Sequence, residues 1–166
     1  MFTIDAEDFH WIDGSADDPK DLCLHGTACA VIGEKKYVYD SAVSSTALYL
    51  LKSLTENHIM NESDNQILPC CGHFMFADNE YENVTVLGCP NGIDWSVIHN
   101  GDSVILETED GSKECIPIED YRNMVFMFCD KIESFYDSCS PKEFSNIENE
   151  RIYHAFWNEW HRKRGK

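Results

Sequence analysis

The sequence predicts a one-domain α+β protein, in which strands and helices are grouped rather than alternated. Two apolar segments near the start are followed by one helical pattern. Five short segments divided by turn residues come next, and two more helical patterns end the chain. Strands that cluster in this way favour antiparallel pairing, because parallel strands need long connections between them. With 166 residues, 43% of them hydrophobic, the chain is long enough to bury a core. We therefore expect a single domain over residues 1–166.

Residues 1–21 form an acidic N-terminal segment with seven acids and one lysine. Its stretch SADDPKD (15–21) is typical of a loop, so we expect the segment to be partly loop. An N-terminal β-hairpin follows, with strands over about 23–32 and 36–40. Its turn is Gly33-Glu34-Lys35, since glycine tolerates the backbone angles of a tight turn.

Three helices are expected, over about 44–58, 119–138 and 146–163. In the first, Ala47, Leu50, Leu51 and Leu54 recur at helical spacing. The second has an apolar stripe of seven residues on one face. Those residues are Tyr121, Met124, Val125, Phe128, Ile132, Phe135 and Tyr136.

The third helix begins at a capping box, with Ser145 as its cap and Glu148 reaching back. It carries an aromatic face made of Tyr153, Phe156, Trp157 and Trp160. We interpret this face as core packing, with a partly exposed stripe for a partner as the alternative. The terminal HRKRGK is interpreted as a helix C-terminus with a fraying basic tail, with a nucleic-acid or import patch as the alternative.

The region 73–118 predicts an antiparallel β-meander of about five strands. Its turns lie at 78–83, Pro90-Asn91-Gly92, Asn100-Gly101 and Asp110-Gly111, and Asn-Gly and Asp-Gly are strong hairpin signals. Two-residue turns fix the strand register, so cross-strand partners follow from the turn centres. We centre the four turns on 80/81, 91/92, 100/101 and 110/111.

Cys71, His73 and Cys89 are the candidates for a metal or thiol site. The predicted register places Cys71 and His73 on one face of the sheet and Cys89 on the other, so we expect no bound metal and no cofactor. A structural zinc site also requires four ligands, usually with a C-x₂₋₄-C pair, and this chain has no such pair. A one-residue slip in the turn 78–83 would bring the three together. A thiol- or zinc-dependent enzyme is therefore the less favoured alternative.

The same register aligns Asp94, Glu107 and Glu114 on three adjacent strands. Like charges that face each other across a sheet are destabilising unless a cation meets them. We interpret this acidic row as a docking spot for lysine or arginine side chains of a partner. The alternative is an open sheet end, where water and salt screen the three carboxylates.

The composition points to a basic protein partner. The formal net charge is −17, and residues 1–150 alone carry −21. Such a field repels nucleic acid and anionic membranes and attracts basic surfaces. The chain shows no secretory signal and no membrane span, so we expect a cytoplasmic protein whose eight cysteines are reduced.

These observations predict a non-enzymatic acidic protein-binding module. Its most concrete form is a bacterial immunity protein or antitoxin that masks a basic toxin, because a toxin that attacks nucleic acid must present a basic surface. The alternative is an acidic adaptor or regulatory domain with another protein partner.

Overall fold

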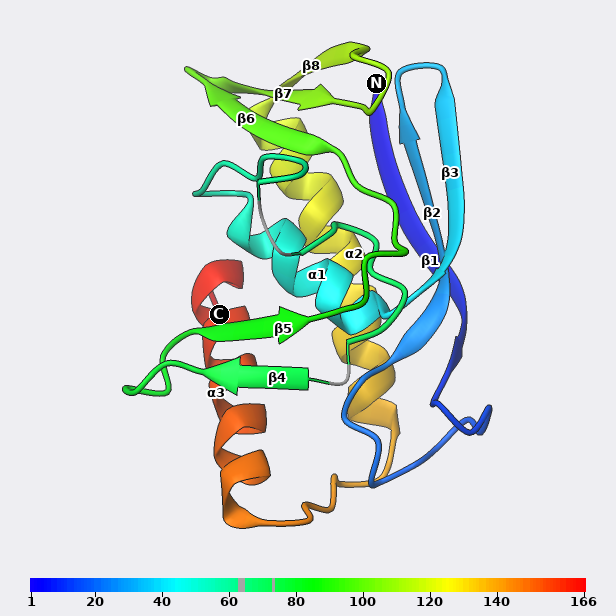
Figure 1. The fold of residues 1–166 in the computed structure, drawn as a ribbon, viewed down its shortest axis with the longest axis vertical. Coiled ribbons are helices and arrows are strands. Elements are labelled where there is room, and N and C mark those ends of the chain that lie inside the picture. Colours follow the sequence, from blue (N-terminus) through cyan, green and yellow to red (C-terminus); the bar gives the residue numbers. More distant parts are fainter. Residues whose placement is uncertain (63–64, 73) are drawn as a thin grey trace.

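The computed structural model describes residues 1–62, 65–72 and 74–166. In this part of the chain it has three helices and eight strands, arranged in three small antiparallel sheets (Figure 1). The elements are β1 (Phe2–His10), β2 (His25–Ile32), β3 (Lys35–Ser41), α1 (Val43–Lys52), β4 (Phe74–Ala77), β5 (Val84–Leu87), β6 (Ser96–Asn100), β7 (Ser103–Glu107), β8 (Lys113–Pro117), α2 (Ile118–Ser138) and α3 (Ile147–Arg164). The predicted α+β class is confirmed.

The first sheet has the order β1-β2-β3. The predicted N-terminal hairpin is confirmed as β2 and β3, but the acidic segment before it begins with a nine-residue strand that the sequence analysis missed. In β1 the side chains of Phe2, Ile4 and Ala6 are buried, while the residues between them are exposed. This alternation places one face of β1 on the core and leaves its acids in water.

The predicted five-stranded meander is wrong as a single sheet. Strands β4 and β5 pair with each other, and β6, β7 and β8 form a separate sheet. Residues 88–95 break the meander between β5 and β6, because they turn toward residues 66–72 instead. Leu68 and Ile93 exchange backbone hydrogen bonds of 2.9 Å in each direction there. Pro90, which has no N–H to donate, also suits this segment to irregular backbone.

Strand register follows the prediction in one hairpin and departs from it in two. Phe74 faces Leu87, as predicted for β4 and β5. Asn100 faces Ser103, so the β6–β7 turn is Gly101-Asp102 rather than Asn100-Gly101. Between β7 and β8 the loop spans 108–112, an odd number of residues, and the register shifts by one. A one-residue shift changes which face each side chain occupies.

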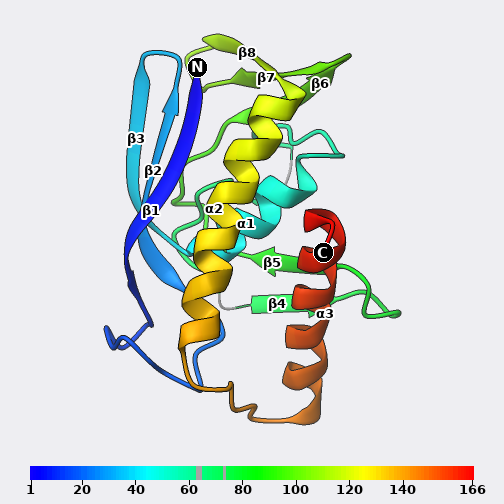
Figure 2. The same cartoon turned by 180° about the vertical axis from the view of Figure 1, so that it is seen from behind.

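Helix α1 is the most buried of the three helices. Helix α1 is buried from Val43 to Leu51 and packs on β2, α2 and α3. It ends at Lys52, six residues before the predicted end, and the chain then turns so that His58 pairs with Val97. Helices α2 and α3 match their predicted ranges to within one residue. Helix α2 lies behind α1 in Figure 1 and in front of it in Figure 2. The buried apolar residues of the sheets and helices form one hydrophobic cluster.

The sheet of β4 and β5 packs one face on α3 and exposes the other. Val84 and Val86 are buried on the inner face. On the outer face Phe74 is 69% exposed and Phe76 53%. Within the described part of the chain, no helix combines the length and the apolar character that a bilayer span requires.

Candidate functional site

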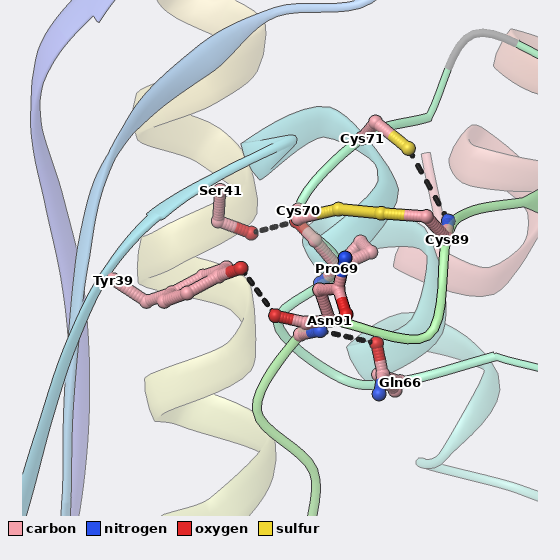
Figure 3. The surroundings of a disulfide bond; sticks show 9 residues. Tyr39, Ser41, Gln66, Pro69, Cys70, Cys71, Cys89 and Asn91 are labelled. Atoms are coloured by element: carbon pink, nitrogen blue, oxygen red, sulfur yellow. Dashed lines mark hydrogen bonds between the residues drawn. A yellow bond between two sulfur atoms is a disulfide. The ribbon is translucent and has the colours of Figure 1, made fainter.

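Two irregular segments, 66–72 and 88–93, lie against each other beside the end of β3 (Figure 3). Besides the pairing of Leu68 with Ile93, the backbone N–H of Gly92 donates to Oε1 of Gln66 at 2.7 Å. A Cβ atom on Gly92 would lie 2.3 Å from the carbonyl oxygen of Leu68. Only glycine therefore allows the two segments to approach this closely.

A disulfide joins these segments between Cys70 and Cys89, with a Cα–Cα distance of 6.5 Å. The expectation that all eight cysteines are reduced is therefore wrong for this pair. The other six are free, and burial raises the pKa of the Cys23 thiol to about 12. Sequence reasoning missed the disulfide because a spacing of 19 residues has no local signature.

Cys71 lies directly beside the disulfide. Its Sγ accepts a hydrogen bond of 3.2 Å from the backbone N–H of Cys89. The sulfur atoms of Cys70, Cys71 and Cys89 all lie within 4.8 Å of one another. We call these three residues the thiol cluster. The prediction that Cys71 and Cys89 lie on opposite faces is wrong, because both lie outside the strands to which register applies. His73 lies outside the described residues.

The end of β3 and the start of α1 attach the thiol cluster to the body of the protein. Oγ of Ser41 donates to the carbonyl oxygen of Pro69 at 2.9 Å, and the N–H of Ala42 donates to the same oxygen at 3.0 Å. The hydroxyl of Tyr39 donates to the carbonyl oxygen of Asn91 (Figure 3). Each segment of the cluster therefore has its own contact with the core, apart from the disulfide.

The acidic row is not formed. Because the β7–β8 register is shifted by one, Glu107 faces Lys113, and their side chains form a 3.0 Å ion pair. Glu114 faces Leu106 and lies on the other face, where it pairs with the N-terminal ammonium of Met1 at 2.6 Å. Both carboxylates are thus met by cations of the same chain.

Asp94 lies in the irregular segment before β6, away from the other two acids. Its Oδ1 pairs with Nε2 of His58 at 2.8 Å and accepts from the N–H of Ile67 at 3.0 Å. The side chains of Asp94 and His58 are 11% and 12% exposed. Asp94 therefore acts as a structural acceptor, and a role for any of the three acids toward a partner stays a prediction.

The basic residues at the end of the chain form ion pairs with acidic residues of the same chain. Arg164 pairs with Asp130 at 2.8 Å and Lys166 with Glu133 at 2.5 Å, which joins the end of α3 to α2. Lys163 pairs with Glu56 beyond the end of α1. The hydrogen bond from Arg164 lowers the pKa of Asp130. HRKRGK is therefore a helix end, as the first interpretation predicted, but its bases are paired and do not form the expected fraying tail.

An open groove of about 510 Å³ lies between the end of α2, the connection 139–146 and α3. We call it the aromatic groove; it is lined among others by Tyr136, Asp137, Phe144, Tyr153, Trp157 and His161. The predicted aromatic face of the last helix is partly buried in the core and partly exposed in this groove. Phe156 and Trp160 are buried, whereas Tyr153 and Trp157 are partly exposed in the groove.

Two acidic segments lie near the aromatic groove, and Asp137 of the second lines it together with Lys142. Segments 11–21 and 137–150 together hold eight acids and two lysines. The first is anchored on the second, because Oγ of Ser140 donates to Oδ2 of Asp17 at 2.7 Å and the N–H of Glu143 donates to the carbonyl oxygen of Pro19 at 2.8 Å. Among the described residues, none of the eight carboxylates forms an ion pair with lysine or arginine.

Lys142 shows how this region holds a cation. Its ammonium lies 3.2 Å from the centre of the Trp11 ring and donates to the carbonyl oxygen of Asp18 at 2.7 Å. Trp11 itself is fully buried. Burial lowers the pKa of Lys142. The combination of an aromatic face and an oxygen acceptor is a recognised way to bind an ammonium or guanidinium group.

Comparisons of the chain with protein-family models, with curated proteins and with solved structures found no match. Function is therefore inferred from the geometry and charge of two places, the aromatic groove and the thiol cluster. The sequence offered a signal for the groove in the aromatic spacing of the last helix. For the thiol cluster it offered the three cysteines but not their convergence.

Proposed function

We propose that this protein is a non-enzymatic, acidic protein-binding module that covers a basic partner. The observation that carries the proposal is the aromatic groove, near which lie eight carboxylates; none of them forms a salt bridge with a lysine or arginine of the described chain, and Lys142 is the one basic residue of that kind in the groove lining. An acidic surface attracts a basic partner over a distance, and an aromatic groove gives the partner's cationic side chains a place to bind.

A lysine or arginine of the partner would lie over Tyr153 or Trp157 with its charge toward Asp137. The chain already contains two arrangements of this kind, in Lys142 over Trp11 and in Arg164, whose guanidinium lies 3.9 Å from the centre of the Phe126 ring. Contacts of a cation with an aromatic face are worth about 0.5–2 kcal/mol each, depending on desolvation. Tyrosine and tryptophan are also common among the residues that dominate interface energetics.

The concrete form that we propose is a bacterial immunity protein or antitoxin. A toxin that attacks nucleic acid needs a basic surface, and an acidic neighbour can cover that surface with fast, electrostatically steered association. A cytoplasmic location is part of the proposal, and the six free cysteines support it. In that compartment the Cys70–Cys89 disulfide would be exposed to cellular thiols, which tend to reduce such bonds.

A second candidate is an adaptor or regulatory domain whose partner is not strongly basic. The exposed outer face of β4 and β5 favours it. Phe74 and Phe76 lie there, and Leu87, which faces Phe74, is 38% exposed. A partner that binds this face would tolerate high salt, since apolar contacts are not weakened by screening.

The first test measures association with the product of the adjacent gene, if that product is basic. The double variant Asp137→Asn/Glu143→Gln removes one charge that lines the groove and one from the connection 139–146 beside it. The matched control Asp102→Asn/Glu109→Gln removes two exposed charges near the β6–β8 sheet, at the other end of the molecule (Figure 1). We expect the groove variant to slow association about threefold or more at low salt, and the control to change it little.

Two results would contradict the proposal. One is equal slowing by the groove variant and the control, which would assign the effect to net charge alone. The other is a functional failure, in which an excess of this protein gives no protection against the neighbouring toxin. Binding that persists at high salt and is lost in Phe74→Ser/Phe76→Ser would instead support the adaptor function.

A further inference from the structure

We propose that the thiol cluster, once its disulfide is reduced, binds one soft cation of the Cu(I) class through Cys70, Cys71 and Cys89. This inference is independent of the partner-binding function. It rests on the convergence of three sulfur atoms within 4.8 Å, all on partly exposed residues. Thiolates are the ligands that soft metal ions prefer.

The unusual feature of the cluster is that two ligands come from adjacent residues. In a strand, neighbouring side chains point to opposite faces and could not share an ion. Cys70 and Cys71 lie in irregular backbone between Leu68 and β4, and both of their sulfurs lie toward Cys89 (Figure 3). A Cβ atom on Gly88 would lie 2.8 Å from the carbonyl oxygen of Cys71, so glycine there permits the close approach of the two segments.

The three thiols should stay together after reduction, because other contacts hold the two segments. The backbone pairing of Leu68 with Ile93 and the bond from Gly92 to Gln66 cross between them. Ser41 and Tyr39 fix one segment each to β3. The ligands are therefore arranged before the ion arrives, which reduces the ordering cost of binding.

The number of ligands selects the ion. Structural Zn²⁺ sites are closed by four ligands. Among the described residues, the group of histidine, cysteine and acidic ligand atoms that converges at this place has three members, all of them sulfur. A set of three thiolates with no oxygen or nitrogen ligand suits a soft, three-coordinate ion such as Cu(I) better than Zn²⁺, Mg²⁺ or Ca²⁺.

Oxidation closes the site. In the structure, two of the three sulfurs are bonded to each other and cannot act as thiolates. A dithiol reductant opens the disulfide by supplying two electrons and two protons, and is itself converted into a disulfide. Cu(I) then displaces the thiol protons from the sulfurs it binds, so its affinity should rise with pH. The disulfide and the metal complex are thus alternative states of one site.

The experiment uses the full chain and Cu(I) itself, held anaerobically by a chromophoric chelator such as bicinchoninate. We expect the reduced protein to take one equivalent of Cu(I) from the chelator, and the oxidised protein to take none at this site. Cys71→Ser should weaken binding by more than the ~10–100-fold that loss of a mere outer-shell partner costs. Serine can still accept the hydrogen bond from Cys89, so the variant should fold. The matched control is Cys115→Ser, which removes an exposed free thiol elsewhere.

Circular dichroism of the reduced protein and of each variant accompanies the titration. Three results would overturn the proposal: Cu(I) bound equally well by Cys71→Ser, Cu(I) bound equally well by the oxidised protein, or loss of the folded structure on reduction. X-ray absorption should show three sulfur neighbours at the copper ion. A shell of two sulfurs, or one that includes nitrogen, would also contradict the three-thiolate assignment.

Discussion

The aromatic groove and the thiol cluster are built in opposite ways. The groove lies between the ends of two regular helices and the connection that joins them, and its aromatic residues on α3 recur at a spacing that can be read from the sequence. The cluster lies in irregular backbone, where two segments meet through glycines, hydrogen bonds and a disulfide. Periodicity in the sequence can therefore predict a surface on a helix. The convergence of two loops depends instead on long-range contacts, which have no local sequence pattern.

The two regions also differ in what holds them. In the described chain, helix α3 is attached to its neighbours without any covalent bond, and one of its polar attachments is a buried carboxylate. Glu159 is 1% exposed, accepts from the N–H of Val84 at 2.7 Å and pairs with Lys52 at 3.3 Å. The thiol cluster has a covalent bond in addition to its hydrogen bonds. Substitutions in each region can therefore show which attachment matters more for stability.

We expect the largest loss of stability from Glu159→Ala. The change leaves the buried N–H of Val84 without this acceptor and Lys52 without its carboxylate, and breaking a buried ion pair typically costs about 3–5 kcal/mol. Urea unfolding measures the difference. The matched control is Asn158→Ala on the same helix, an exposed position where about 0.5 kcal/mol or less is expected. A loss below about 1 kcal/mol for Glu159→Ala would show that this buried carboxylate contributes little to the attachment of α3.

Removal of the disulfide should come second. The bond closes a loop between residues 19 apart, and in the chain-entropy model such a loop contributes about 3 kcal/mol. Cys70→Ala/Cys89→Ala should therefore lower the free energy of unfolding by roughly that amount. Hydrogen exchange sharpens the test, because the amides of Leu68 and Ile93 should stay protected in the folded variant. Loss of that protection would mean that the disulfide alone holds the segments together.

The smallest effect should come from acid. The bond from Arg164 lowers the pKa of Asp130, so this carboxylate stabilises the fold above its ordinary pKa of 3.8 and loses that contribution as the pH falls through the lower folded-state value. Because the pair is partly exposed, we expect about 1 kcal/mol or less. Melting temperatures measured from about pH 5 to 2 should fall less steeply for Asp130→Asn than for the wild type. Asp102→Asn, which removes an unpaired acid, should follow the wild-type slope.

Much of the fold could be predicted from the sequence wherever one physical pattern decided the structure. The apolar stripe of α2 and the capping signal of α3 located both helices to within one residue. The cap of α3 is nevertheless Asn146, whose Oδ1 accepts from the N–H of Asn149, and not the predicted Ser145. The first strand was missed because its acids suggested a loop, although Phe2, Ile4 and Ala6 alternate as a half-buried strand requires. Helix α1 was predicted too long, because Leu54 continues the helical spacing after the backbone has left the helix.

The candidate sites were less predictable, because they depend on single residues in turns. The 108–112 loop has five residues, one fewer than the predicted pairing leaves between its strands, so Glu107 and Glu114 lie on opposite faces and each pairs with its own cation. Strand register could not place Cys71 and Cys89, since neither lies in a strand. The sequence predicted that Tyr153 and Trp157 share one face of the last helix. Their exposure, however, depends on how the connection 139–146 passes beside α3.

The anchoring of the acidic loop has a consequence for how the chain folds during synthesis. Asp17 and Pro19 contact Ser140 and Glu143, more than a hundred residues later. The loop leaves the ribosome early and has no docking site until α2 and the segment after it have been made. Contacts between such distant residues slow folding, since a long loop must close before they form. The docking of segment 11–21 on segment 137–150 is therefore among the last steps of folding. A nascent chain stopped before residue 140 would lack it.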